Sequence, residues 1–139
     1  MRTKILLVFA LFLMLTGFNG ENRIVEQDGV NLQASVGEGV APSFIRKPVV
    51  RVSEDGRRLF IELQFMADPR PSVTWYRDGV VLKESQKYKM SLKADGDRVY
   101  IAMLEINNIT PKDAGQYRVN VKNELGEANA TANVNFDNE

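Results

Sequence analysis

Two Asn-X-Thr triplets are the residues whose type and spacing could carry chemistry. Asn108-Ile-Thr110 and Asn129-Ala-Thr131 each match the acceptor motif for an N-linked glycan, which is added to chains in the secretory pathway. In the last alternating segment, residues 128–136, Asn129 is one of the polar residues that should face solvent, and that position suits a bulky sugar. The triplets therefore predict two glycosylation sites, on the condition that the chain is secreted.

The other side chains point away from catalysis. The 139 residues contain no His and no Cys, which excludes Cys/His zinc sites, Cys nucleophiles and Ser-His-Asp triads. The carboxylates do not cluster in a way that suggests paired acid/base work. Basic and acidic side chains number 18 each, and no long run of one sign suggests a nucleic-acid footprint. We expect no enzyme, no cofactor, no metal and no small-molecule substrate.

The first twenty residues have the pattern of a secretory signal peptide. Arg2 and Lys4 form a short positive region ahead of the apolar run Ile5–Phe18, and Gly17 or Gly20 supplies a small residue near a cleavage point. The run falls short of the ~20 apolar residues that a bilayer-spanning helix needs. We predict a cleaved signal over residues 1–20 and no transmembrane anchor. An uncleaved anchor or a buried helix are the alternatives.

Residues 21–41 are polar, contain three glycines and show no sustained period. We expect them to form a flexible leader, and a binding peptide within it stays possible on sequence grounds. Period-two alternation of apolar and polar residues then recurs along the chain, over 59–65, 117–122 and 128–136. Asp-Gly pairs separate the segments, and Asp78-Gly79 predicts a hairpin turn. Many short strands with regular turns indicate an all-β sandwich over residues 42–137.

Three segments resemble an intermediate-set (I-set) immunoglobulin domain over some ninety residues. Pro69 to Gly79 resembles its B–C loop and C strand, Leu104 to Tyr117 its E strand, E–F corner and F strand, and Asn123 to Gly126 its F–G turn. The resemblance implies an immunoglobulin-like Greek-key β-sandwich. Asn108 falls where this family commonly has Asn for structural reasons, near the tight E–F corner.

The resemblance also assigns a fold core. Trp75 should fill the space between the sheets, Tyr117 should form the tyrosine corner, and Asp113 should hold the E–F corner. The two sheet-bridging cysteines of the family would fall at Leu63 and Val119, so the domain lacks the inter-sheet disulfide. Such a bridge typically contributes ~2–5 kcal/mol in small secreted domains, and apolar packing must replace it.

The missing cysteines and the signal-like start imply different compartments. Cysteine-free domains of this kind resemble intracellular modules of muscle proteins such as twitchin and titin. The start resembles that of secreted invertebrate proteins with one immunoglobulin domain, some of which organise receptors and adhesion complexes at synapses, including neuromuscular ones. We expect a secreted extracellular binding or scaffolding protein whose partners are ectodomains. The alternative is an intracellular structural module of the muscle or cytoskeletal kind.

One surface is a candidate partner site. If Leu104 and Ile106 point inward, other apolar side chains of the same segment and of the neighbouring B strand point outward. These candidate interface residues are Phe60, Met66, Val99, Ile101 and Met103. A bulge that shifts the register, or Lys and Arg stems that cover the patch, would remove it.

The basic residues near this surface have a simpler interpretation. We expect them to be solvated side chains at strand edges, where lysines discourage sheet-to-sheet aggregation. They are Arg57, Arg58, Lys83, Lys87, Lys89 and Lys93.

Overall fold

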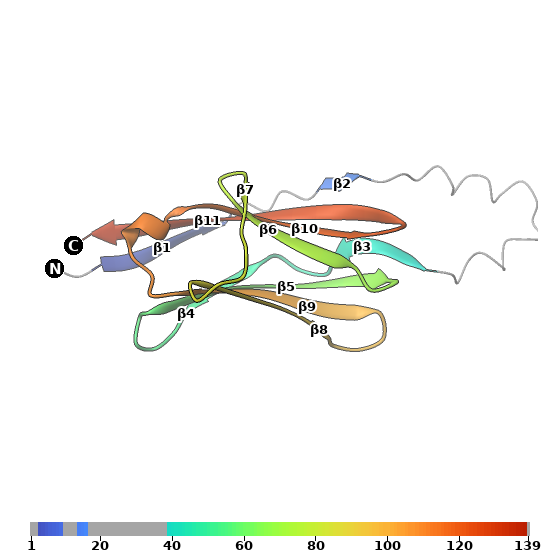
Figure 1. Cartoon of the computed structure of the whole chain (residues 1–139), viewed down its shortest axis with the longest axis horizontal. Helices are drawn as coiled ribbons and strands as arrows, with labels where there is room; N and C mark the ends of the chain where they lie inside the picture. The colour runs from blue at the N-terminus through green and yellow to red at the C-terminus, as the bar shows by residue number, and fades with distance from the viewer. Residues whose placement is uncertain (1–2, 10–13, 17–38, 139) are drawn as a thin grey trace, which may run out of the picture.

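A computed structural model describes residues 3–9, 14–16 and 39–138, which form two antiparallel sheets packed face to face (Figure 1). In the first sheet the order is β3-β5-β9-β8, and β4 also pairs with β5. Its strands are β3 (Val40–Phe44), β4 (Val49–Val52), β5 (Arg58–Asp68), β8 (Tyr88–Ala94) and β9 (Val99–Asn107).

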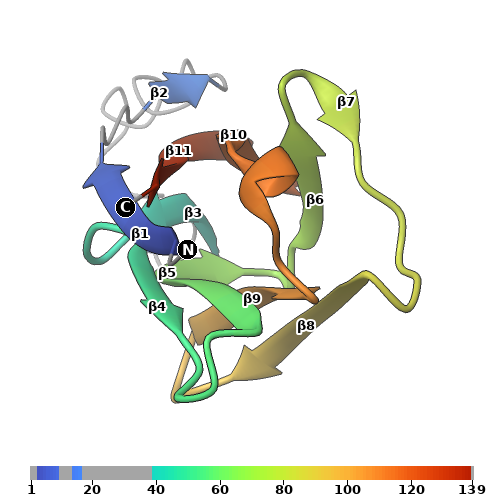
Figure 2. The ribbon, with the colours of Figure 1, turned by 90° about the vertical axis from the view of Figure 1, so that its left-hand side faces the viewer.

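In the second sheet the order is β1-β11-β10-β6-β7, and β2 also pairs with β11. Its strands are β1 (Thr3–Phe9), β2 (Met14–Thr16), β6 (Ser72–Arg77), β7 (Val80–Val81), β10 (Gly115–Asn123) and β11 (Gly126–Asn138). A 3-10 turn, η3 (Pro111–Asp113), lies at the crossing from β9 to β10. The end-on view in Figure 2 shows the two layers and this crossing between them.

The predicted all-β sandwich is confirmed, and the period-two segments are its central strands. In β5 and β10 every second residue is buried, because strand side chains alternate between the two faces of a sheet. The buried residues from both sheets form one core. Its members are Leu59, Ile61, Leu63, Phe65, Ala67, Trp75, Ala102, Leu104, Ile106, Tyr117, Val119, Val121, Ala130, Ala132 and Val134.

The family's two cysteine positions lie within this core. Leu63 is 2% exposed and Val119 is 1% exposed, and Trp75 stands directly opposite Val119 in the β6–β10 ladder. Apolar side chains therefore fill the space that a disulfide would cross, and the sequence contains no cysteine. Full burial of an aliphatic side chain of this size contributes about 1.5–3 kcal/mol.

The Asp78-Gly79 pair forms the hairpin turn between β6 and β7. Arg77 pairs with Val80 across it, which leaves a two-residue loop. Asp78 has φ +47° and Gly79 has φ +86°. Two successive residues of positive φ match the twist of an antiparallel hairpin, and Asp and Gly accept that conformation most readily.

The N-terminal strands pair with the edge of β11. Thr3–Phe9 runs antiparallel to residues 132–138, and Met14–Thr16 pairs with residues 127–129. The rest of the predicted signal, residues 1–2, 10–13 and 17–20, lies outside the described residues, as does 21–38 of the predicted leader. β3 begins at Val40, inside the predicted leader. The signal peptide and its cleavage stay predictions. Among the described residues, no helix is long and apolar enough to cross a bilayer.

Candidate protein-binding surface

The five apolar side chains predicted to point outward share one surface, here called the β5–β9 outer face: Phe60, Met66, Val99, Ile101 and Met103. The register that creates it is unbroken, with Met66 opposite Val99 and Met103 opposite Glu62. Between the outward residues of β9, the alternate residues Ala102, Leu104 and Ile106 are at most 1% exposed. The five residues are therefore neighbours on the solvent side of one sheet, with no bulge between β5 and β9.

The exposure of these side chains is uneven. Met66 is 36% exposed, while Val99, Ile101 and Met103 are half-buried by their neighbours. Two further apolar side chains extend the surface toward β3 and β4, Ile45 at 48% and Val49 at 38% exposure. Val49 stands opposite Glu62, and Ile45 donates its N–H to the Gln64 carbonyl at 2.9 Å. The sequence pattern did not point to Ile45 or Val49, because neither lies in an alternating run.

Phe60 differs from the other four. The guanidinium carbon of Arg51 lies 4.5 Å from its ring centroid, and that of Arg58 lies 5.7 Å away. Arg58 also pairs with Glu105 at 3.4 Å. Arginine side chains thus cover the Phe60 ring through cation–π contacts. The remaining apolar residues of the outer face run from Met103 through Ile101 to Val99 on β9 and to Met66 on β5.

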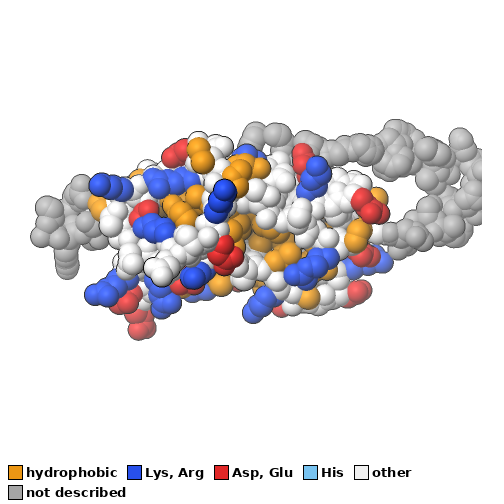
Figure 3. Space-filling view, in the orientation of Figure 1, with side chains coloured by type: hydrophobic (Ala, Val, Ile, Leu, Met, Phe, Trp, Pro, Cys, Tyr) orange, Lys and Arg blue, Asp and Glu red, His pale blue; other side chains and the backbone are white. Residues whose placement is uncertain are grey.

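Charged and polar residues border this surface on the β8 side. Lys89 stands opposite Glu105, Ser91 opposite Met103, and Lys93 opposite Ile101. Figure 3 views the sandwich from its side, not onto this outer face, and shows hydrophobic side chains between the two sheets with charges of both signs interspersed around them. An apolar centre with a charged border is the usual composition of a protein–protein contact surface.

The outer face of the other sheet is polar and internally bonded. The Asn129 side-chain oxygen accepts hydrogen bonds from Arg118 Nη1 at 2.9 Å and from Asn120 Nδ2 at 3.1 Å. The Arg118 guanidinium carbon lies 3.9 Å from the centroid of the Tyr76 ring. Asn129, the predicted acceptor on this strand, is thus half-buried and engaged through its amide oxygen.

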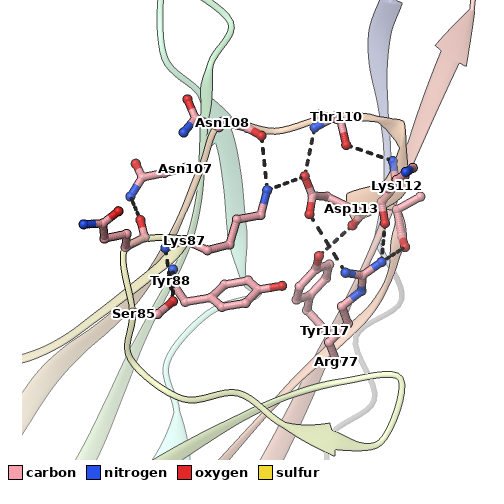
Figure 4. Close-up of polar contacts among 12 residues, drawn as sticks. Arg77, Ser85, Lys87, Tyr88, Asn107, Asn108, Thr110, Lys112, Asp113 and Tyr117 are labelled. Atoms are coloured by element: carbon pink, nitrogen blue, oxygen red, sulfur yellow. Dashed lines mark hydrogen bonds and ion pairs between the residues drawn. The ribbon is translucent and has the colours of Figure 1, made fainter.

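The crossing from β9 to β10 is held by Asp113, whose side chain is 6% exposed (Figure 4). Its Oδ2 accepts the backbone N–H of Thr110 at 2.8 Å and the Lys87 ammonium at 2.9 Å. Arg77 Nη1 lies 3.9 Å from Oδ1. The Tyr117 hydroxyl donates to the Asp113 carbonyl at 2.6 Å, which is the geometry of a tyrosine corner.

The same corner explains Asn108 and corrects our interpretation of Lys87. Asn108 has φ +51°, a left-handed conformation in which Asn is favoured among non-glycine residues, and its side chain is exposed. Lys87 was expected to be a solvated edge residue. Instead it bridges the Asn108 carbonyl, at 3.1 Å, and Asp113. Sequence reasoning missed this contact because Lys87 and Asp113 are far apart in the chain.

The corner carries no sign of catalysis. Burial raises the pKa of the Tyr117 hydroxyl well above its ordinary range, which keeps the hydroxyl protonated as a donor. Among the residues that the structure describes, no group of three or more acidic, His or Cys side chains could hold a metal ion. The described buried side-chain N and O atoms all have hydrogen-bond partners. Asp113, Tyr117 and their partners therefore hold the fold.

The two packed sheets, their strand order and the tyrosine corner define an immunoglobulin-like sandwich. The immunoglobulin I-set domain family matches residues 42–136, so the chain belongs to the I-set family. Leu63 in β5 and Val119 in β10 stand at the positions of the family's two cysteines, and both are aliphatic in this chain. The family is a domain family and indicates no particular reaction.

The curated relatives include very long proteins. Titin of Drosophila melanogaster is 33% identical over 95 residues, which is 68% of this chain and, after rounding, 0% of that protein. The muscle M-line assembly protein unc-89 of Caenorhabditis elegans is 37% identical over 81 residues, 58% of this chain and 1% of that protein. The chain thus spans 1% or less of the length of these two relatives.

Solved structures resemble the same part of the chain. Titin domain M4 has a TM-score of 0.58 at 28% identity and covers 68% of this chain and 93% of its own. A titin M10–obscurin-like 1 complex has a TM-score of 0.53 at 33% identity, with 68% and 90% covered. Both matched chains consist almost wholly of the matched domain.

Proposed function

We propose that the chain is a secreted, non-enzymatic binding protein that holds the ectodomain of a partner against the β5–β9 outer face. The observation that carries this proposal is the row Met103, Ile101, Val99 and Met66, which presents apolar side chains to solvent on a sheet bordered by charges. Grouped exposed apolar side chains of this kind mark partner sites more often than isolated ones. On the outer face of the other sheet, Arg118, Asn120 and Asn129 of β10 and β11 are polar and bond to one another.

Secretion and the scaffolding role rest on the sequence. The positive residues Arg2 and Lys4 ahead of the apolar run Ile5–Phe18 support export. A small binding domain outside the cell could organise receptor or adhesion complexes, including those at synapses. Expression of the full chain with a C-terminal tag tests this part of the proposal. We expect tagged protein in the medium, with an N-terminus near residue 21; tagged protein that stays in the cytosol with Met1 intact would end the secreted proposal.

The binding surface has a separate test. Replacement of Ile101 and Met103 by Thr removes apolar contact area while retaining residues that suit strands. The tagged wild-type protein is crosslinked in the tissue that expresses it, and the attached species are compared with those of the double variant. Val81→Thr is the matched control, because Val81 is 49% exposed on β7, away from the outer face. We expect the double variant alone to lose the attached species.

The minority of interface residues whose truncation costs more than about 1 kcal/mol cluster near the centre of the interface, so the loss of two central side chains should weaken binding clearly. Thermal melts of all three proteins should show a folded domain. If the double variant keeps the same crosslinked species as Val81→Thr, the β5–β9 outer face is not the binding surface.

Glycosylation belongs to the same proposal. Asn108 is exposed at the corner, whereas the Asn129 amide is half-buried and accepts two hydrogen bonds. The sequence favoured Asn129 over Asn108, and these contacts reverse that order: we expect the secreted protein to carry a glycan at Asn108 and a smaller occupancy at Asn129. Glycosidase treatment should increase gel mobility, and Asn108→Gln should remove most of that change. Equal mobility of treated and untreated protein would remove both sites.

A second function is favoured by the relatives. Titin and the muscle M-line assembly protein unc-89 match this domain, and the core contains no cysteine. The chain would then be an intracellular structural module of muscle or cytoskeleton. The compartment of the tagged full chain separates the two functions, since both use the same sandwich.

A further inference from the structure

The outer edge of β11 is paired only by residues from the start of the chain. Residues 3–9 lie antiparallel to residues 132–138 in seven consecutive pairs without a register shift. β3 and β4, which precede β5 in the chain, both pair with β5 on the opposite sheet. Within residues 39–138, no strand pairs with this edge of β11.

The backbone groups of β11 that point to this edge can be assigned from the ladder. Asp78 donates its N–H to the Gln116 carbonyl at 2.9 Å, so the even-numbered residues of β10 direct their backbone groups to β6. The odd-numbered residues of β10 then face β11, where their partners are even-numbered. Asn133, Asn135 and Asp137 therefore turn their N–H and C=O groups away from β10, toward the outer edge.

This edge lacks the lysines found on β8, one edge of the first sheet. β8, the last strand of the first sheet, carries Lys89 and Lys93, and lysine on an edge strand discourages pairing with another chain. β11 has no lysine, arginine or proline, and its charged residues are Glu127 and, within the proposed site, Asp137. Its buried side chains here are small, as Ala128, Ala130 and Ala132 show.

We propose that the outer edge of β11, residues 132–138, is a strand-addition site that binds an extended apolar segment of a partner protein, antiparallel to β11, once residues 3–9 have left it. The inference rests on the proposed removal of residues 1–20. The occupant is an extended polypeptide because the site offers backbone donors and acceptors at every second residue. It is apolar because the apolar residues 5–9 are the register partners of residues 132–136.

The test uses residues 21–139, the mature chain of the proposed function, which contain β3 to β11 and every core residue and lack β1 and β2. The probe is a fluorescent synthetic peptide of residues 2–9, and its anisotropy is followed as the protein is titrated. We expect saturable binding, with amide chemical-shift changes grouped along β11. No binding, or shift changes confined to the β5–β9 outer face, would overturn the proposal.

Two variants of one residue sharpen the test. Asn135→Pro removes an edge N–H without touching the β10 ladder, which ends at the Gly115–Val134 pair. Asn135→Thr keeps the N–H and serves as the matched control. We expect Asn135→Pro to weaken peptide binding roughly tenfold or more, because a backbone bond is lost and the ring crowds the added strand. Equal affinity of the two variants would contradict a strand-addition site.

A second copy of the chain is the competing occupant. Sedimentation of residues 21–139 without peptide should give a monomer. A dimer that Asn135→Pro converts to a monomer would overturn the proposal, since a second copy would then occupy the edge. The outcome is independent of the secretion test: peptide binding by a chain that cells do not export would refute secretion alone, and an exported chain that binds no peptide would refute the edge site alone.

Discussion

The β4–β5 turn and the β9–β10 corner lie next to each other, joined by a hydrogen bond of 3.0 Å from the Ile109 N–H to the Arg57 carbonyl. Each is organised by one aspartate. Asp55 accepts the Ser53 hydroxyl at 2.6 Å and the Arg57 N–H at 3.0 Å in full contact with solvent. Asp113 accepts a similar number of donors while almost wholly buried. Loss of the Asp55 carboxylate leaves donors that can bond to water instead. Loss of the Asp113 carboxylate leaves buried donors without any partner, which costs more free energy.

The largest effect is expected for Asp113→Ala. The substitution leaves the Thr110 N–H, the Lys87 ammonium and the Arg77 guanidinium without their carboxylate. Loss of one partner from a buried charged network should lower the free energy of unfolding by about 2–4 kcal/mol, with allowance for the partial exposure of Lys87. Urea denaturation measures it. The double variant with Lys87→Met should lose less than the sum of the single losses; additive losses would show that the pair is not coupled.

Tyr117→Phe should have the next largest effect. It removes the bond to the Asp113 carbonyl and should cost about 1–2 kcal/mol at pH 7. Burial raises the pKa of the folded-state hydroxyl, while the unfolded chain ionises near its ordinary ~10. The stabilisation is therefore complete below pH ~10 and is lost as the pH rises above it. Unfolding measured from pH 8 to pH 11 should show the gap between wild type and variant narrowing; a constant gap would contradict this.

Asn108 offers a smaller effect with a built-in control. Its backbone is left-handed, and a residue with a Cβ but no amide is strained there by about 1 kcal/mol. Asn108→Ala should lower the free energy of unfolding by roughly that amount, while Asn108→Gly should change it little. Chemical denaturation of unglycosylated protein measures both. Equal losses in the two variants would mean that the Asn108 side chain, not the backbone conformation, stabilises the corner.

Asp55→Ala should have the smallest effect of the four. The hydrogen bond from Ser53, followed by that from the Arg57 N–H, lowers the pKa of the Asp55 carboxyl. Its contribution is thus present above the ordinary carboxyl range and lost as the pH falls below it. We expect Asp55→Ala to lower the melting temperature at pH 7 by less than Asn108→Ala does, and the difference from wild type to shrink as the pH falls below the ordinary carboxyl range. A loss comparable to that of Asp113→Ala would erase the distinction between the two turns.

The fold could be predicted from the sequence because its signals are local. Alternation in β5, β10 and β11 fixed which residues face inward, and Asp78-Gly79 marked a hairpin that forms between adjacent strands. The outer face followed from the same parity once the resemblance paired the B and E strands. These inferences depend on which face of a strand each residue occupies, and not on how far its side chain extends.

The contacts that sequence reasoning missed depend on long side chains from distant segments. Lys87 reaches Asp113 across the corner, and Arg51 covers Phe60 from a neighbouring strand. A flexible basic side chain gives the same pattern whether it is solvated or bonded, so its residue type does not reveal its partner. The pairing of residues 3–9 with β11 was missed for another reason, since an apolar run suits a signal peptide, a helix or a strand.

The aliphatic pair Leu63 and Val119 has a consequence for how the chain folds. The two residues are more than fifty positions apart, in strands of opposite sheets, and a cross-link would keep those strands close in the unfolded chain. Here the chain must bring β5 and β10 together by diffusion, and burial alone keeps them there. Folding consequently needs no oxidant or isomerase at this step, and its rate should be the same with and without a thiol reductant.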